Sequence, residues 1–176
     1  VFRATVAVRP GSVDSGDDGY IAVIAHEVTA ARHETEQLRH RASHDPLTGL
    51  SNRRQVLSVL ENAVAQQRGD DGHVAALFID LDRLKYVNDA LGHAVGDRLL
   101  VSTAARLAEA VRPSDHVARI GGDEFAIILP PQPSLKSIEI WLHSLLKTVG
   151  QPITIDGHQL QFSISAGVAL LPQDGN

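Results

Sequence analysis

The sequence predicts an α/β or α+β domain built around one sheet at residues 44–176. Residues 73–82 are apolar almost throughout, as expected for a strand that is covered on both faces. Residues 116–130 and 153–171 each contain two apolar runs joined by a glycine-containing turn, a pattern typical of β-hairpins. Between these segments apolar residues recur at helical spacing, so helices should alternate with strands around the sheet.

Residues 1–26 predict two strands of an incomplete sheet. Two apolar runs, at residues 2–8 and 20–25, flank a stretch rich in glycine, serine and aspartate. Two strands alone are only marginally stable, so we expect them to belong to a sheet whose earlier part lies outside this sequence. Residues 27–43 are predicted to form a linker helix, because apolar and small residues recur there at spacings of three and four. A short coiled coil and a solvated connector helix explain this pattern equally well.

A turn at residues 44–52 is predicted to end this helix, because Pro46 disfavours helical geometry at the residue before it. A second helix should begin near residue 53 and end before the loop at residues 69–72. The buried strand at residues 73–82 then follows. The beginning of the domain is therefore expected to be a turn, a helix and a strand.

The chain after this strand predicts three more helices between the hairpins. Asp80 and Asp82 end the strand, and their period-two spacing directs both side chains to one face. A short helix is expected around residues 85–88, and a longer one at residues 96–111. A third helix is expected at residues 135–149, between the two hairpins.

The composition is that of an ordinary globular protein and argues against several functional classes. Hydrophobic residues make up 43% of the chain and charged residues 21%. The 16 basic and 21 acidic residues give a net charge of −5. The sequence contains no long basic run of the kind that would indicate a nucleic-acid partner. The sequence contains no cysteine, which excludes disulfides, thiolate zinc sites and cysteine nucleophiles.

No apolar run in the sequence reaches the length of a membrane span. The chain begins at Val1 within a strand-like run and shows no signal peptide, so we interpret it as part of a longer protein. We expect a cytoplasmic location, and any membrane anchor of the parent protein would lie upstream.

Three acidic residues are expected to converge on a divalent cation. Asp80 ends a buried strand, where a carboxylate is costly unless a cation meets it, and Asp123 and Glu124 follow a Gly-Gly turn. Magnesium prefers carboxylate and phosphate oxygens, and two such ions can activate a hydroxyl for attack on a phosphoryl group. Lys85 follows Asp80 by five residues, where a helix is expected to begin. Taken singly, an acidic turn is usually solvated and Lys85 would be an ordinary surface lysine. Only the three acids and this lysine together indicate a site.

Four recognisable motifs follow one another in residues 44–176. In chain order they are DPLTGLSNRR at residues 45–54, DLDRLKYVND at 80–89, GHAVGD at 92–97 and RIGGDEF at 119–125. Together they resemble the diguanylate cyclase family. The resemblance implies a GGDEF palm-like fold similar to nucleotide cyclases, with a central mixed sheet flanked by helices. It also implies that two GTP molecules are condensed into cyclic di-GMP and pyrophosphate. Each domain would hold one GTP, so a homodimer is required for catalysis.

The family pattern assigns roles to individual residues. Glu124 would bind metal or deprotonate the attacking 3′-hydroxyl, while Asn88 and Asp97 would bind the guanine edge. The predicted metal ligands for Mg²⁺ or Mn²⁺ are Asp80, Leu81 through its carbonyl, Asp123 and Glu124. The predicted catalytic residues are Glu124, Asp123 and Lys85, and the predicted substrate-binding residues are Asn88, Asp97, Arg83, Leu84, Gly121 and Gly122.

Arg112 and Asp115 are predicted to form an inhibitory site for the product. An arginine three residues before an aspartate is by itself an ordinary helix-end ion pair. Asp115, however, lies six residues before Gly121, which matches the RxxD inhibitory site of the family. The resemblance implies that cyclic di-GMP binds there and inhibits the enzyme.

The sequence also departs from the family pattern and leaves a second function open. Leu84 replaces the usual phenylalanine, and the sequence ends at Asn176, where the family continues into a last helix carrying a lysine and an arginine for the triphosphate. Residues 27–29 resemble the ending of PAS sensor domains, so residues 1–26 would be the end of a PAS-like domain. The alternative function is a regulatory module that binds GTP or cyclic di-GMP and controls a fused or partner EAL phosphodiesterase. The retained acids and glycines favour the enzyme.

Overall fold

The computed structural model describes residues 2–9, 20–27, 40–66, 72–132 and 134–171. The chain divides into two units, Val1–Ala42 and Ser43–Asn176, which are described in turn.

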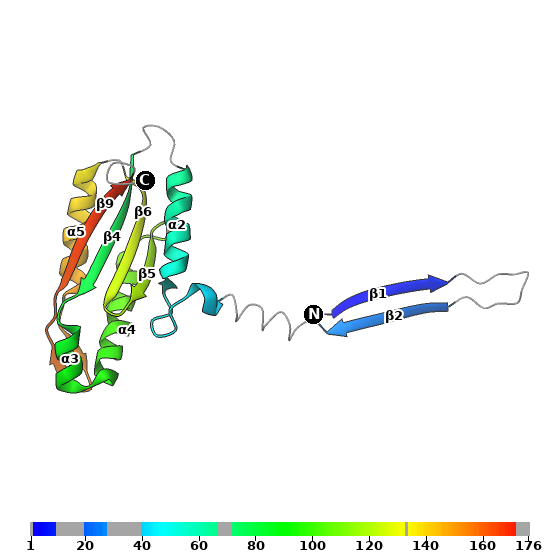
Figure 1. The fold of residues 1–176 in the computed structure, drawn as a ribbon, viewed down its shortest axis with the longest axis horizontal. Helices are drawn as coiled ribbons and strands as arrows, with labels where there is room; N and C mark the ends of the chain where they lie inside the picture. The colour runs from blue at the N-terminus through cyan, green and yellow to red at the C-terminus, as the bar shows by residue number, and fades with distance from the viewer. Residues whose placement is uncertain (1, 10–19, 28–39, 67–71, 133, 172–176) are drawn as a thin grey trace, which may run out of the picture. The chain divides into compact units, whose positions relative to one another are not determined.

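The first unit contains a two-stranded antiparallel sheet (Figure 1). Its strands are β1 (Phe2–Arg9) and β2 (Tyr20–Glu27), paired without a register shift. The two predicted strands are therefore confirmed, and the PAS-like assignment stays a prediction. Of the predicted linker helix, residues 40–43 are helical. Residues 28–39, on which the coiled-coil interpretation depends, lie outside the described residues.

A five-stranded mixed sheet is the centre of the second unit (Figure 1). Its strands are β3 (Ser51–Asn52), β4 (His73–Leu81), β5 (His116–Gly121), β6 (Glu124–Gln132) and β9 (Ile164–Leu171). Their order is β3-β5-β6-β4-β9, with β3 parallel to β5 and the other neighbouring pairs antiparallel. Strand β4 is therefore paired on both of its edges, and the predicted mixed sheet is confirmed. The prediction that β4 is covered on both faces is wrong at its C-terminal half, where Phe78 is 56% exposed on the face that helix α2 (Arg53–Gln66) only partly covers.

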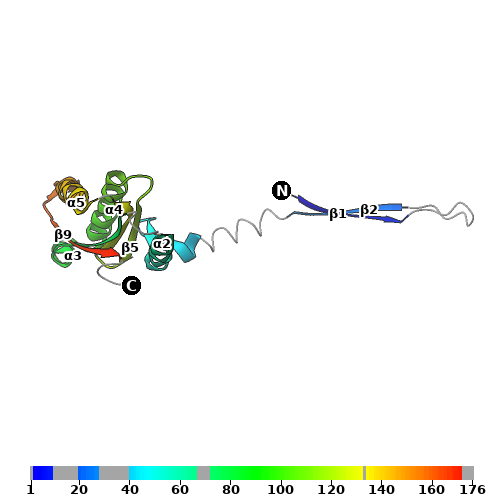
Figure 2. The ribbon, with the colours of Figure 1, turned by 90° about the horizontal axis from the view of Figure 1, so that it is seen from above.

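The helices cover the two faces of this sheet unequally. They are α2 (Arg53–Gln66), α3 (Leu84–Leu91), α4 (His93–Ala110) and α5 (Leu135–Val149). Helices α3, α4 and α5 enclose the larger core, in which Leu77, Leu107 and Phe125 are fully buried. Helix α2 covers part of the opposite face, as Figure 2 shows from above, and its Val56 packs in a second buried cluster. None of the described helices is both long and apolar enough to cross a membrane.

Two sequence-based predictions differ from the observed elements. The predicted hairpin at residues 153–171 is only partly correct, because β7 (Ile153–Ile155) pairs with the short β8 (His158–Leu160). Strand β9 instead pairs with β4, where it satisfies the backbone groups on the edge opposite β6. The helix predicted to begin at residue 96 begins at His93, since Gly92 alone separates it from α3.

Candidate active site

The predicted metal ligands lie around the C-terminal end of β4. Asp80 pairs with Glu124 of β6 on one side and with Ser165 of β9 on the other. Directly opposed residues of antiparallel strands share a face, so the exposed side chains of Asp80 and Glu124 lie on one face of the sheet. The Asp123 carbonyl accepts a hydrogen bond from the Leu81 N–H at 3.1 Å. The fold therefore brings these four predicted ligands to one end of the sheet.

The carboxylates in this cluster repel one another. Desolvation raises the pKa of Asp80, and the negative charges of Asp123, Asp82 and Glu124 raise it further. A divalent cation would relieve this repulsion, and carboxylates are the ligands that Mg²⁺ and Mn²⁺ favour. Within the described residues, no three acidic or histidine side chains already form a closed metal site. A cation bound here would take further oxygens from a carbonyl or a substrate phosphate, as Mg²⁺ commonly does.

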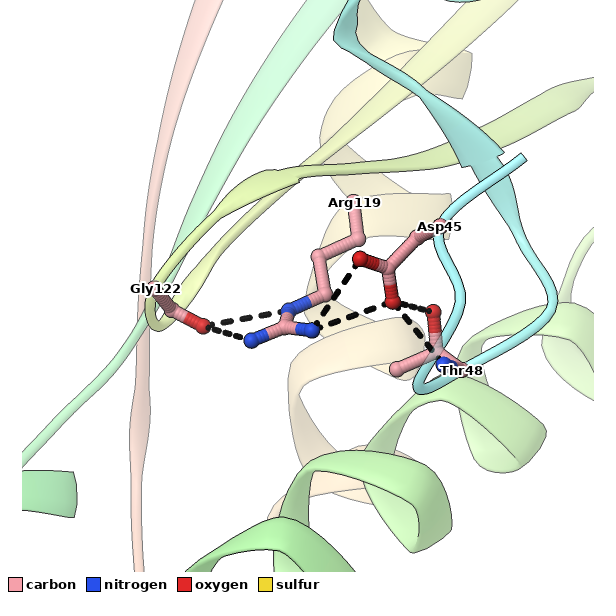
Figure 3. Close-up of polar contacts among 4 residues, drawn as sticks. All are labelled: Asp45, Thr48, Arg119 and Gly122. Carbon is pink, nitrogen blue, oxygen red and sulfur yellow. Dashed lines mark hydrogen bonds and ion pairs between the residues drawn. The ribbon is translucent and has the colours of Figure 1, made fainter. Parts of the chain in front are cut away.

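The tip of the β5–β6 hairpin is held by an arginine (Figure 3). Arg119 donates to the Gly122 carbonyl from Nε at 3.1 Å and from Nη2 at 2.7 Å. The Arg119 Nη1 group donates to both carboxylate oxygens of Asp45, at 3.0 and 3.2 Å. Asp45 Oδ1 also accepts from the N–H and the hydroxyl of Thr48, at 2.8 and 2.7 Å. One guanidinium thus connects the hairpin tip to the turn at the start of the domain.

This Asp45–Arg119 pair was not assigned a role from the sequence. Desolvation opposes ionisation of Asp45, but the Thr48 hydrogen bonds and Arg119 outweigh it, so the pKa of Asp45 is lowered. The two residues are 74 positions apart, and the sequence shows no pattern that pairs them. The available signal was that each opens a recognised motif, DPLTGL and RIGGDEF.

An apolar groove of about 530 Å³ lies beside the acidic cluster. It runs over the sheet face that carries Asp80 and Glu124, and α2 lines one side of it. Phe78 and Leu57 line the groove and are 56% and 49% exposed. The acids therefore lie at the end of an open, largely apolar sheet face.

The predicted phosphate-binding residues begin α3. Arg83 precedes this helix in the left-handed conformation, with φ 64° and ψ 22°. Arg83 and Lys85 line a shallow surface hollow with Tyr86 and Asp89, while Leu84 is buried in the core. The substitution of the family's usual phenylalanine by Leu84 is thus a change in packing. The structure thus places two positively charged side chains, those of Arg83 and Lys85, directly after the acidic end of β4.

The predicted guanine-binding residues lie on the adjacent helices α3 and α4. Asn88 packs so closely against Gly96 that a Cβ atom there would lie 1.8 Å from Asn88 Oδ1. Asp97 follows Gly96 directly and is exposed. Because Gly96 has no side chain, Asn88 of α3 can pack directly against α4, one residue before Asp97.

Arg112 and Asp115 form a tight turn after α4. Asp115 Oδ2 accepts from the Arg112 N–H at 2.9 Å, and the Asp115 N–H donates to the Arg112 carbonyl at 3.0 Å. The carboxylate thus bonds to the backbone of Arg112, and within the described residues no ion pair joins the two side chains. Both residues border a small hollow that is also lined by Gln132 and Trp141.

Comparison with known proteins identifies the same part of the chain. Residues 42–176 match the family described as "Diguanylate cyclase, GGDEF domain". The bifunctional diguanylate cyclase/cyclic di-GMP phosphodiesterase MucR of Pseudomonas aeruginosa is 39% identical over 170 residues, which cover 97% of this chain and 24% of MucR. The diguanylate cyclase TpbB of the same species is 40% identical over 141 residues, covering 80% of this chain and 32% of TpbB.

Solved structures agree with this match. The structure of a delta-N mutant of TpbB from Pseudomonas aeruginosa, comprising only the GGDEF domain, has a TM-score of 0.71 at 40% identity, covering 75% of this chain and 78% of that chain. The coiled coil and GGDEF domain of DgcB from Caulobacter crescentus, solved in complex with c-di-GMP, has a TM-score of 0.73 at 26% identity, covering 81% and 76%. The chain spans between 24% and 32% of the full length of MucR and TpbB.

Proposed function

This chain belongs to the GGDEF family of diguanylate cyclases, and from that premise we propose that it condenses two GTP molecules into cyclic di-GMP. In each half-reaction the 3′-oxygen of one GTP forms a bond to the α-phosphorus of the other, and the bond to pyrophosphate breaks. The 3′-hydroxyl proton passes to a base, for which Glu124 is the proposed group. The observation that carries the proposal is the gathering of Asp80, Asp123 and Glu124 at the end of β4.

The residues fit magnesium or manganese, because the cluster supplies carboxylate oxygens that repel one another. The proposed ligands are Asp80, Asp123, Glu124 and the Leu81 carbonyl. A bound cation would supply charge stabilisation at the attacked phosphoryl group and acidify the hydroxyl. The chain's own residues orient the nucleotide, with Lys85 and the amides of Arg83 and Leu84 proposed to bind phosphates.

Specificity for guanine is proposed to come from Asn88 and Asp97, which offer an amide and a carboxylate for hydrogen bonds. Gly121 and Gly122 are proposed to leave the backbone open to the nucleotide, because glycine itself carries no side chain. Since one domain holds one GTP, the proposed reaction needs a homodimer in which two sites face each other. Arg112 and Asp115 are proposed to bind the product and inhibit the enzyme.

The name of MucR joins a diguanylate cyclase to a cyclic di-GMP phosphodiesterase in one protein, so we propose a regulatory role beside a phosphodiesterase as the second function. As a regulatory module, the chain would bind GTP or cyclic di-GMP and control an EAL phosphodiesterase, fused or separate, without making product. Retention of the acidic cluster favours the cyclase.

The test is nucleotide chromatography after incubating a purified protein that contains this chain with GTP and Mg²⁺. The double variant Asp123→Asn, Glu124→Gln should form no cyclic di-GMP. Glu139→Gln, which removes an exposed carboxylate paired with Lys136 on α5, should leave turnover unchanged. Intact GTP after incubation with a folded, dimeric protein would exclude the cyclase and favour the regulatory module.

A further inference from the structure

Asp82 is held by two serines at the beginning of β9. The Ser163 hydroxyl donates to Asp82 Oδ2 at 2.6 Å, and the Ser165 hydroxyl donates to Oδ1 at 2.8 Å. The Asp82 N–H also donates to the Ser163 carbonyl at 3.0 Å. Both carboxylate oxygens and the backbone N–H of this half-buried residue therefore have partners on one neighbouring segment.

Asp80, two residues earlier, is in a different situation. Within the described part of the chain, no hydrogen-bond donor contacts its carboxylate, and the charges that act on it are those of other acids. A carboxylate without donors keeps all its lone pairs for a cation, whereas one that already accepts a hydroxyl bond on each oxygen is fixed in orientation and has fewer lone pairs left to offer. The two aspartates of the DLD sequence are thus suited to different roles, Asp80 to binding a cation and Asp82 to holding the backbone.

The segment that Asp82 anchors connects the acids to the phosphate-binding turn. On one side of Asp82, the Leu81 N–H donates to the Asp123 carbonyl at 3.1 Å. On the other side, Arg83 has a positive φ of 64°, which is uncommon for a residue with a side chain. The Arg83 carbonyl then accepts from the Tyr86 N–H at 2.9 Å in the first turn of α3. A backbone conformation of this kind persists where its surroundings fix it.

We propose that Asp82 is a positioning residue, whose hydrogen bonds from Ser163 and Ser165 fix the turn at residues 81–84 in the form that binds GTP. This inference rests on the proposed function, in which this turn supplies the Leu81 carbonyl and the amides of Arg83 and Leu84. Asp82 acts through the geometry of its acceptors, and its negative charge is not required. Ser163 and Ser165 thereby become part of the nucleotide site without touching the nucleotide.

The experiment separates acceptor geometry from charge by comparing Asp82→Asn with Asp82→Ala. An asparagine still accepts from one serine through Oδ1, and its Nδ2 group can donate to the other hydroxyl. Binding of 3′-deoxy-GTP, which lacks the attacking hydroxyl, is measured by calorimetry with Mg²⁺ and again with EDTA. Asp80→Asn serves as the variant that removes a proposed metal ligand, and Ser144→Ala on the exposed side of α5 serves as the serine control.

Asp82→Asn should bind the analogue within about threefold of the wild type, whereas Asp82→Ala and the double variant Ser163→Ala, Ser165→Ala should bind at least about tenfold more weakly. The gain in affinity on adding Mg²⁺ should persist in these variants and disappear in Asp80→Asn. The serine double variant keeps the test decisive if Asp82→Ala fails to fold, as judged by circular dichroism.

Three results would overturn the inference. Loss of the Mg²⁺ effect in Asp82→Asn would make Asp82 a metal ligand. Wild-type affinity in the serine double variant would show that these hydrogen bonds do not position the turn. A folded wild type that does not bind the analogue would overturn the proposed function and this inference with it, a result distinct from the other two.

Discussion

Replacing Arg119 with methionine should destabilise the domain substantially and release the hairpin tip. The guanidinium bonds both the Gly122 carbonyl and the Asp45 carboxylate, and the two charged side chains are only 11% and 16% exposed. Removing one partner of a buried ion pair costs about 3–5 kcal/mol. Asp45 keeps its two bonds from Thr48, so we expect the lower end of that range, about 3 kcal/mol.

Urea unfolding followed by circular dichroism measures this loss. Asp45→Asn should lower the free energy of unfolding by about 1 kcal/mol, because the asparagine oxygen still accepts from Thr48 or Arg119. The matched control is Arg98→Met, which breaks an exposed pair with Asp156 whose side chains are 51% and 45% exposed. The control should cost less than about 1 kcal/mol.

A double-mutant cycle of Asp45→Asn and Arg119→Met then tests the coupling. The two losses should be non-additive by up to about 1 kcal/mol, because both variants break the same bonds and the smaller single loss is about 1 kcal/mol. We call the Asp45–Arg119 pair, with the Gly122 carbonyl that Arg119 also bonds, the Asp45–Arg119 clamp. Strict additivity would refute the stabilising role of this clamp, as would a loss for Arg119→Met no larger than that of the Arg98→Met control.

The same pair predicts an acid dependence of stability. The pKa of Asp45 is lowered from its ordinary value of 3.8, because its hydrogen bonds and Arg119 outweigh desolvation. The unfolded chain therefore binds more protons in acid, so the stabilisation is complete above about pH 4 and is lost as pH falls through the lower folded value. Asp45→Asn should lose this part of the pH dependence in urea titrations below pH 5.

Three further outcomes are expected. Gly96→Ala should displace Asn88 and weaken GTP more than ATP in competition binding, because its Cβ would lie 1.8 Å from Asn88 Oδ1; equal losses would contradict this role. Burial, and then the charge of His44, lowers the pKa of His116 below 6.5, so stability should fall as pH drops below 6.5, and His116→Asn should flatten that part of the unfolding profile. Arg112→Ala should relieve inhibition by added cyclic di-GMP in turnover assays while leaving the initial rate unchanged.

Local patterns sufficed to predict most of the fold. The continuous apolar run of β4, the Gly-Gly hairpin of β5 and β6 and the helix at α5 were each predicted from residues close together in the sequence. The pairing of β9 with β4 was not predicted. It depends on contacts between residues that are distant in the sequence, whereas the predicted hairpin paired β9 with its neighbour in the chain. Periodicity alone cannot choose between two partners for an apolar strand.

The places of the acidic residues in the fold were predictable to a similar degree, while their roles stay predictions. Asp80, Asp123 and Glu124 could be singled out because they lie at a strand end and in a glycine turn. The Asp45–Arg119 clamp and the serines that hold Asp82 could not be found this way, since their partners lie 74, 81 and 83 residues apart. Serine and arginine are also common surface residues, so their identity alone carries little information.

The double pairing of β4 has a consequence for how related chains can change in length. From Ala75 to Asp80 the strand is in continuous register with β6, and it is paired with β9 over the same residues. A single inserted residue inside this stretch would turn Asp80 toward the core and Ile79 toward solvent. The existing register shift lies between His73 and Ala75, at the opposite end of the strand. Insertions and deletions should therefore accumulate only at that end, and the acidic end should keep its length unchanged.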